Sequence, residues 1–261
     1  MDETDSGQAK AEYAGPRSPV RVMQIVETLA EAREPVSLAS LAQRLGIPKT
    51  SALNHLRVLV TTGHVMTQGA GYVLGPASLR LGAVITANSA PLSVISTIVR
   101  RLAEETGETA ICGVLARNTH EVVYIDVSEG RHSIRYSPPV GARRQLYCSG
   151  MGRALLAFQS EQYIRDYLDA TKLERHNANT VTSKPKLKKI LEQTRQDRIA
   201  ITLGESVEDL GAIAAPVVER SGAVQYSVGV AIPVMRFAQN RAGIQRVVLE
   251  AAERASWALG G

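Results

Sequence analysis

The chain has 261 residues, enough for two domains of ordinary size, with a formal net charge of +5 at pH 7 and 44% hydrophobic residues. No segment has the length and apolarity of a membrane span, and the charged N-terminus lacks the apolar core of a secretion signal, so we expect a cytoplasmic protein that stays out of the membrane. The two cysteines, Cys112 and Cys148, have no second Cys or His at metal-ligand spacing, so we expect neither a zinc site nor a disulfide framework.

Charge is distributed unevenly along the chain. Residues 1–16 contain one Lys and four Asp or Glu, a net charge of −3, whereas residues 17–88 contain seven Lys or Arg and three Glu, a net charge of +4. The acidic leader, which bears Gly and Ser, is expected to be disordered and to make no contact with DNA. The basic region that follows suits a polyanionic partner, although solvated surfaces also carry such a charge.

The first predicted helix begins near Arg17. One stripe of its surface is apolar and contains Val22, Ile25, Val26 and Leu29. Arg17 and Arg21 lie at the start of the helix, where an arginine side chain either reaches the DNA backbone or minor groove, or is simply solvated. The sequence leaves both interpretations open.

Two short helices joined by a tight turn follow in residues 37–62. The apolar stripe of the first of them contains Leu38, Leu41 and Leu45. Ser37 is a good N-cap, and Gly46 ends this helix with a left-handed residue. Pro48 suits the first turn of the second helix, which we expect over residues 48–62. The pattern is a helix-turn-helix, although leucine-rich hairpins with a glycine turn also occur in helical bundles.

The second helix has an apolar face and a polar face. At about 100° per residue, the apolar face contains Ala52, Leu53, Leu56, Leu59 and Val60. The opposite face, which is free to enter a major groove, contains Thr50, Ser51, Asn54, Val58 and Thr61. The amide of Asn54 can bond N6 and N7 of an adenine together, whereas Lys49 in the first turn is better placed for phosphate. His55 and Arg57 flank this face and serve either backbone or base.

A β-hairpin is predicted after the second helix. Residues 64–68 and 71–74 alternate in polarity around the turn Gly69-Ala70, which in this position is typical of the wing of a winged helix. We therefore assign residues 17–76 to a winged helix-turn-helix domain that binds double-stranded DNA. Its candidate DNA-contacting residues are Arg17, Arg21, Ser37, Lys49, Thr50, Ser51, Asn54, His55 and Arg57.

The rest of the chain mixes helices and strands. A linker helix is expected within residues 77–90, and an amphipathic helix runs from Leu92 to Thr106. Further helices are predicted near residues 151–158 and 185–196, and strands at residues 109–116, 121–126, 132–136, 212–218 and 224–230. This order implies an α+β domain with an antiparallel sheet over residues 91–261. We expect the lone Trp257 to dock the final helix.

The segment Gly150-Met151-Gly152 invites an enzyme interpretation. It begins like a dinucleotide fingerprint, but Leu155 replaces the third glycine. Ser149 does not lie in a nucleophile elbow, because Tyr147 stands where that motif requires glycine. We therefore expect no catalytic residue, no cofactor and no metal. Ser149 can instead cap a helix whose first amides stay open to a ligand carboxylate.

Six segments, in order along the chain, carry a family signature. Three lie in the N-terminal region, at residues 20–26, 41–51 (LAQRLGIPKTS) and 71–75, and three lie in the C-terminal region, at residues 140–143, 149–158 (SGMGRALLAF) and 214–217. In these segments the chain resembles the IclR family of transcriptional regulators, and the resemblance covers nearly the whole chain. It implies a GAF-like effector-binding fold for the second domain. It also implies a homodimer, often a dimer of dimers, that binds paired half-sites on operator DNA.

The resemblance further implies an effector pocket formed by Tyr136, Ser149, Gly150, Met151, Thr202, Ala212, Gly229 and Ala231. Family members that bind small polar acids tend to carry an acid at the position of Thr202 and a cysteine at that of Ala212. They tend to have serines in place of Gly229 and Ala231. The smaller and less polar side chains here remove hydrogen-bond partners and enlarge the cavity, so we expect a bulkier, apolar or aromatic effector. The alternative is that these are ordinary sheet residues that serve packing.

Together these patterns predict a ligand-responsive transcriptional regulator that is not an enzyme. Its winged helix binds operator DNA, and its second domain binds a small organic metabolite that changes DNA affinity. One rival is a metabolic enzyme with a fused DNA-binding domain, which turnover by the second domain would favour. The other is a DNA-binding protein without a ligand. Arg198 replaces a glycine common in the family after the helix near residues 185–196, which leaves the shape of that loop open.

Overall fold

The computed structural model describes residues 17–88 and 90–260. The chain divides into two compact units, Met1–Asn88 and Ser89–Gly261. The leader that we expect to be disordered, residues 1–16, lies outside the described residues.

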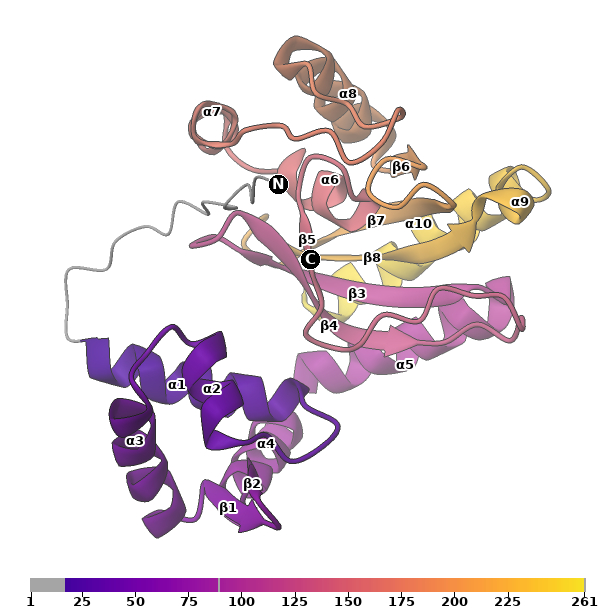
Figure 1. Ribbon diagram of the computed structural model, residues 1–261. Coiled ribbons are helices and arrows are strands. Elements are labelled where there is room, and N and C mark those ends of the chain that lie inside the picture. The colour runs from indigo at the N-terminus through magenta and orange to yellow at the C-terminus, as the bar shows by residue number, and fades with distance from the viewer. Residues whose placement is uncertain (1–16, 89, 261) are drawn as a thin grey trace. The chain divides into compact units, whose positions relative to one another are not determined.

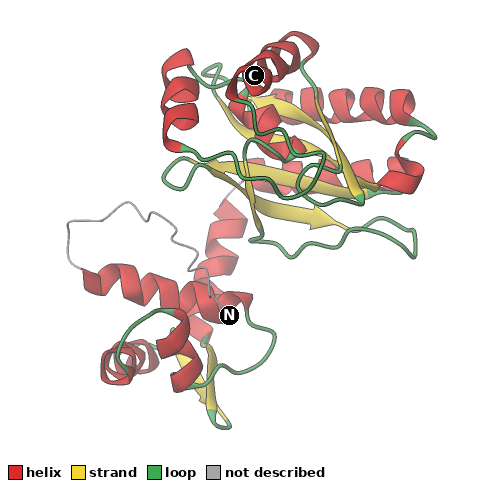
Figure 2. Cartoon of the chain, turned by 45° about the horizontal axis from the view of Figure 1, so that its top comes forward, coloured by secondary structure: helices red, strands yellow, loops and turns green. Residues whose placement is uncertain are grey.

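The N-terminal unit consists of packed helices and one β-hairpin (Figures 1 and 2). In chain order its elements are α1 (Arg17–Glu31), α2 (Leu38–Arg44), α3 (Lys49–Thr61), β1 (Val65–Gln68), β2 (Gly71–Leu74) and α4 (Pro76–Asn88). The two strands are antiparallel, and Val36 adds an isolated bridge to Tyr72 of β2. The core between helices and hairpin contains Ile25, Leu29, Val36, Leu41, Leu56, Leu59 and Val65. The predicted winged helix-turn-helix is therefore confirmed.

The turn between α2 and α3 follows from local chemistry. The Ser37 hydroxyl accepts a hydrogen bond from the Ser40 amide at 3.2 Å, so it caps α2 as predicted. Gly46 has a φ of +59°, a left-handed conformation that a residue without a Cβ adopts at little cost. Pro48 differs from the prediction, because it is the extended N-cap of α3 and the helix begins at Lys49. Val60 also differs: in the last turn of α3 it is 39% exposed.

The C-terminal unit is an α+β domain built on a six-stranded sheet (Figure 1). Its strands are β3 (Thr109–Ala116), β4 (Glu121–Ser128), β5 (Arg143–Gln145), β6 (Ala200–Leu203), β7 (Leu210–Val218) and β8 (Val224–Pro233). They lie in the order β5-β4-β3-β8-β7-β6, and all neighbours are antiparallel. Its helices are α5 (Ala90–Thr106), α6 (Gly150–Leu156), α7 (Glu161–Ala170), α8 (Lys184–Asp197), α9 (Val234–Phe237) and α10 (Arg241–Ala258).

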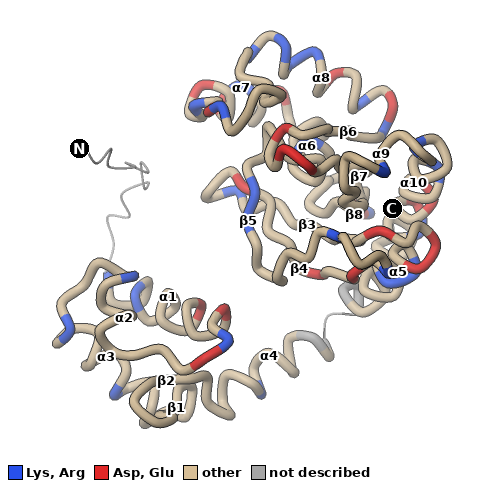
Figure 3. The backbone as a smooth tube through the Cα atoms, turned by 45° about the vertical axis from the view of Figure 1, so that its right-hand side comes forward, with Lys and Arg blue, Asp and Glu red and all other residues tan. Residues whose placement is uncertain are grey.

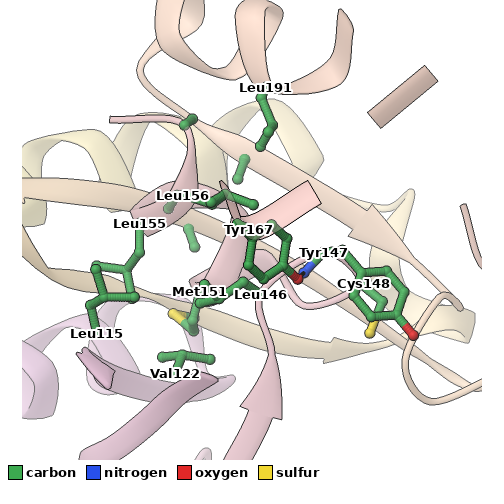
Figure 4. Packing of buried hydrophobic residues seen from close by; sticks show 14 of the residues in the cluster. Leu115, Val122, Leu146, Tyr147, Cys148, Met151, Leu155, Leu156, Tyr167 and Leu191 are labelled. Carbon is green, nitrogen blue, oxygen red and sulfur yellow. Dashed lines mark hydrogen bonds between the residues drawn. The ribbon is translucent and has the colours of Figure 1, made fainter. Parts of the chain in front are cut away.

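Apolar cores cover both faces of this sheet. Helices α5 and α10 pack on one face, where the buried side chains include Ile95, Val99, Leu102, Ile213, Val230 and Val248. Helix α6 packs on the other face, with α7 and α8 outside it, and Figure 4 shows the side chains that gather there. The first residue of α6, Gly150, lies against Ala212 of β7.

The strand predicted at residues 132–136 is wrong. Residues 129–142 form a loop whose backbone is anchored by side chains: the Thr109 hydroxyl donates to the carbonyl of Tyr136 at 2.6 Å, and Arg236 donates to that of Ile134 at 2.9 Å. These hydrogen bonds tie the loop to the unit without making it part of the sheet.

Two residues near helix ends behave differently from expectation. Trp257 does not dock the final helix, because its side chain is 80% exposed, and α10 packs instead through Ile244, Val248, Ala251 and Ala255. Arg198 caps α8 with a φ of +54°. It therefore adopts a left-handed conformation, which glycine takes at little cost and which strains the backbone locally at an arginine.

Candidate functional site

The exposed side of α3 presents the predicted base-reading residues together. Lys49, Thr50, Asn54 and Arg57 are exposed, and Ser51 and His55 are half-buried. The opposite side of the helix is buried through Ala52, Leu56 and Leu59. Packing of these three residues fixes the rotation of α3, so the polar side chains project outward as one set.

The other predicted DNA-contacting residues lie at helix starts. Arg17 is the first residue of α1 and is exposed, and Arg21 is half-buried one turn later. The Ser37 hydroxyl is occupied as an acceptor by its cap bond, but its own hydrogen can still be donated to a phosphate. Sequence reasoning missed Arg44, an exposed arginine in the last turn of α2. Figure 3 shows basic residues on α2 and α3, whereas the acidic residues among residues 17–88 lie in the second half of α1 and just after it.

A cavity of about 30 Å³ lies in the C-terminal unit between the sheet and the start of α6. Its walls are formed by Ile111, Tyr124, Tyr136, Arg144, Cys148, Ser149, Gly150, Met151, Thr202, Ser206, Val207, Leu210, Gly211, Ala212 and Ala231. Seven of the eight residues expected in an effector pocket are among them, and Gly229 is the exception. Residues from distant parts of the chain therefore meet at one place.

Three of these residues lie side by side on the sheet. Thr202 on β6 pairs with Ala212 on β7, which in turn pairs with Ala231 on β8. Residues directly opposite each other in antiparallel strands project to the same side, so the three side chains form one row along the cavity wall. Only Thr202 carries a polar group in this row, and the wall therefore offers a ligand mainly apolar contact.

The segment before α6 forms the facing wall. The Ser149 hydroxyl caps α6 by accepting from the Gly152 amide at 3.2 Å, and it donates to the carbonyl of Gln145 at 2.7 Å. A Cβ on Gly150 would lie 2.8 Å from the Cβ of Ala212, so only glycine allows this backbone to approach the sheet so closely. The side chain of Met151, the next residue of α6, is buried in the apolar cluster shown in Figure 4.

Gly229 does not line the cavity, but it contacts Met151, which does. A Cβ there would lie 2.7 Å from the terminal methyl of Met151 and 2.3 Å from the backbone oxygen of Ile213. The missing side chain therefore makes room for Met151, which itself forms part of the wall.

Arg144 and Tyr124 line the cavity and were not predicted. The Arg144 guanidinium lies 5.8 Å from the ring centroid of Tyr124 and 5.9 Å from that of Tyr136, and it donates to the Tyr136 hydroxyl. On β5, Arg144 pairs with the buried Val122 of β4, which turns its side chain toward the α6 face of the sheet. A strand of three residues is too short to show alternating polarity in the sequence. The direction of the Arg144 side chain could therefore be known only from the pairing of β5 with β4.

Two ionisable groups of the wall are neutral at physiological pH. Burial raises the pKa of the Cys148 thiol to about 11 and raises that of the Tyr124 hydroxyl above its ordinary value. Neither group contributes a charge to the cavity.

A buried ion pair fixes another wall. Both terminal nitrogens of Arg153 donate to the carboxylate of Glu205, one of them at 2.7 Å, and both residues are buried. The Thr180 hydroxyl donates to the backbone oxygen of Glu205 at 2.7 Å. Ser206 and Val207 follow Glu205 directly and line the cavity, so the ion pair and this hydrogen bond together hold them in place.

Residues 17–88 and 90–260 contain neither a metal-binding cluster nor a membrane-spanning helix. No group of three or more His, Cys, Asp or Glu is arranged to hold a metal ion in this part of the chain. Nor does any helix of the described residues have the length and apolarity needed to cross a membrane.

Comparison with known sequences gives a consistent picture along the chain. The family described as bacterial transcriptional regulator IclR C-terminal matches residues 88–257, and the IclR helix-turn-helix domain matches residues 18–69. The transcriptional repressor IclR of Escherichia coli is 28% identical over 248 residues, which cover 94% of this chain and 90% of the repressor. The repressor AllR of the same organism is 29% identical over 258 residues, which cover 97% and 94%. These relatives are transcriptional regulators and not enzymes.

Solved structures show the same fold. An IclR transcriptional regulator from Alicyclobacillus acidocaldarius has a TM-score of 0.85 at 23% identity, covering 94% of this chain and all of its own. An IclR homolog from Microbacterium hydrocarbonoxydans, complexed with 4-hydroxybenzoate, has a TM-score of 0.80 at 19% identity, covering 93% and 99%. The chain therefore belongs to the IclR family of bacterial transcriptional regulators, with an N-terminal DNA-binding domain and a C-terminal effector domain.

Proposed function

We propose that this protein binds operator DNA through α3 and releases or tightens that contact when a small organic metabolite enters the cavity beside α6. The observation that carries the proposal is the convergence of seven expected effector residues on one cavity, in a chain that also presents a polar helix face. Neither site resembles a catalytic centre, which disfavours the rival enzyme.

In the DNA-binding domain, Asn54 contacts a base edge and Lys49 contacts phosphate. Asn54 is exposed at the middle of the outward face of α3, where its amide can form two hydrogen bonds with an adenine. Lys49 lies at the start of the helix, where backbone contacts are common. The remaining candidates, which position the domain on the duplex, are Arg17, Arg21, Ser37, Thr50, Ser51, His55 and Arg57.

The effector is an organic molecule with an apolar or aromatic body. The row of Thr202, Ala212 and Ala231 supports this class, because two of the three side chains end in a methyl group next to the sheet. The cavity of about 30 Å³ has room for about two water molecules. Binding therefore requires a wall to move, and the loop of residues 129–142, which carries Tyr136 and contains no strand, is the best candidate. An IclR homolog of the same fold is complexed with 4-hydroxybenzoate, a compound with an aromatic body.

We further propose a homodimer, or a dimer of dimers, that binds two half-sites. The linker helix α4 supports it, since Leu79, Leu81 and Ile85 are 62%, 50% and 54% exposed. Large apolar side chains at such exposure are typical of surfaces that a partner covers. The corresponding functional division is a DNA-binding domain at residues 17–76, a linker helix at residues 77–90 and an effector domain at residues 91–261.

The experiment uses the full-length protein and a DNA duplex that it selects from random sequence. Thermal midpoints are measured against a panel of aliphatic acids, aromatic acids and neutral aromatic compounds, and each compound that raises the midpoint is then titrated into the protein–DNA complex. We expect at least one compound both to raise the midpoint and to change operator affinity. If no compound does either, the rival ligand-independent DNA-binding protein is the better description.

A further inference from the structure

Arg144 is a cation in the cavity wall without a carboxylate partner. Its guanidinium donates to the backbone oxygen of Arg143 at 2.6 Å and to the hydroxyl of Tyr136, both of which are neutral acceptors. Among the residues that the structure describes, no Asp or Glu forms a salt bridge with it. A half-buried guanidinium that is not neutralised favours an anion beside it.

The other arginines of this region differ from Arg144 in this respect. Arg143, its neighbour on β5, is exposed and lies 3.5 Å from the carboxylate of Glu121. Arg153 in the middle of α6 is buried against Glu205, so its charge is already balanced. Of the residues that line the cavity, Arg144 alone carries a permanent charge, and no lining residue is an Asp or Glu.

Two tyrosine rings flank the guanidinium. Tyr124 is buried on β4, and Tyr136 comes from the loop of residues 129–142; both centroids lie within 6 Å of the Arg144 guanidinium carbon, a separation typical of cation–π contacts. Because Tyr136 accepts its hydrogen bond from Arg144, the hydrogen of its own hydroxyl remains available as a donor. Guanidinium and phenol thus present two neighbouring donors, the arrangement that a carboxylate accepts best.

The remainder of the wall has the opposite character. Ile111, Leu210, Ala212 and Ala231 bring apolar groups to the same cavity. A ligand that fits both parts has one anionic end and an apolar body. This differs from the expectation that an acid would lie at the start of α6, a helix of only seven residues.

We propose that Arg144 is the specificity-determining residue of the effector site and selects an organic carboxylate, whose apolar body lies along Ala212 and Ala231. The inference rests on the proposed function, since it names the ligand class for the same cavity. It predicts that the protein distinguishes a carboxylate from a neutral compound of the same shape. A charge-assisted hydrogen bond is worth enough to separate two such ligands by about tenfold or more.

The test compares matched pairs of ligands on the full-length protein: benzoate with benzamide, and hexanoate with hexanamide. Calorimetric titration should show that at least one acid binds about tenfold more tightly than its amide. Arg144→Gln should bring that ratio to within about threefold, mainly by weakening the acid, and Arg144→Lys should keep part of it because the charge remains. Arg143→Gln, the matched control on the neighbouring exposed residue, should leave the ratio unchanged.

Three results would overturn the inference. If benzamide and hexanamide both bind the unmodified protein as tightly as their acids, the site does not select an anion. If Arg144→Gln and Arg144→Lys both fold, as judged by circular dichroism, and keep the full ratio, the selection resides elsewhere. If neither acid binds while a neutral compound of the wider panel changes operator affinity, the inference fails and the proposed function stands. The proposed function fails only when no compound of that panel, charged or neutral, affects the protein.

Discussion

The exposed face of α3 and the cavity of the C-terminal unit differ in how the chain assembles them. All residues of the α3 face come from one helix, and burial of Ala52, Leu56 and Leu59 is sufficient to orient them. The cavity takes its walls from strands and loops between residues 111 and 231, so it exists only when the whole unit is folded. The face proposed to meet DNA is thus built locally, and the proposed effector site depends on long-range packing.

The largest effect is expected where that long-range packing depends on a buried charge. Arg153→Met leaves the carboxylate of Glu205 buried without its partner, which should lower the free energy of unfolding of the C-terminal unit by about 3–5 kcal/mol. Urea unfolding followed by circular dichroism measures this change. Arg101→Ala removes an exposed pair with Glu105 and should cost less than about 1 kcal/mol. Equal losses in the two variants would mean that the buried pair does not hold the cavity wall.

A smaller effect is expected on the α3 face, and it should fall on binding rather than stability. Asn54→Ala should weaken binding to the preferred duplex by about 1–3 kcal/mol and relax the preference at one base pair. Lys49→Ala is the matched contrast, because loss of a phosphate contact weakens all duplexes alike and reduces the salt dependence of log Kd by about 0.9. Fluorescence anisotropy at several salt concentrations separates the two. A uniform loss in both variants would remove the base-reading role from Asn54.

The smallest effect concerns the turn that presents α3. Ser37→Ala removes the hydroxyl that accepts from the Ser40 amide and should destabilise the N-terminal unit by about 1 kcal/mol. Ser40→Ala is the control, since it keeps that amide and places a strong helix former inside α2. Thermal unfolding of both variants gives the comparison. If they unfold at the same temperature, the cap contributes nothing to the position of the turn.

The N-terminal unit was more predictable than the cavity, because its main features depend on residues that are close together in the sequence. The cap at Ser37, the left-handed Gly46 and the buried side of α3 all follow from residues within a few positions of one another. Two details were still wrong. The periodic pattern placed Pro48 inside α3, although the helix begins at Lys49, and it placed Val60 on the buried face, although its side chain is exposed. Errors of this kind shift a boundary and leave the face intact.

The cavity required information that no local pattern contains. Thr202, Ala212 and Ala231 were identified only through the resemblance to a family, and the register of three strands places them in one row. Arg144 was not predicted, because β5 is too short to show alternating polarity. The direction of its side chain is set by the pairing of Arg144 with Val122 on β4. Register between strands that lie far apart in sequence depends on the complete fold.

The most direct test of the account asks whether the cavity controls the α3 face. Ala212→Leu places a larger side chain in the wall where it meets Gly150, and Ala238→Leu adds the same atoms at an exposed position outside the cavity. Operator affinity is measured by anisotropy with and without the panel compound that raises the thermal midpoint most. We predict that the compound changes the affinity of the unmodified protein and of Ala238→Leu by about fivefold or more, and leaves that of Ala212→Leu unchanged. A normal response from Ala212→Leu would contradict the account, because the metabolite would then act from another site.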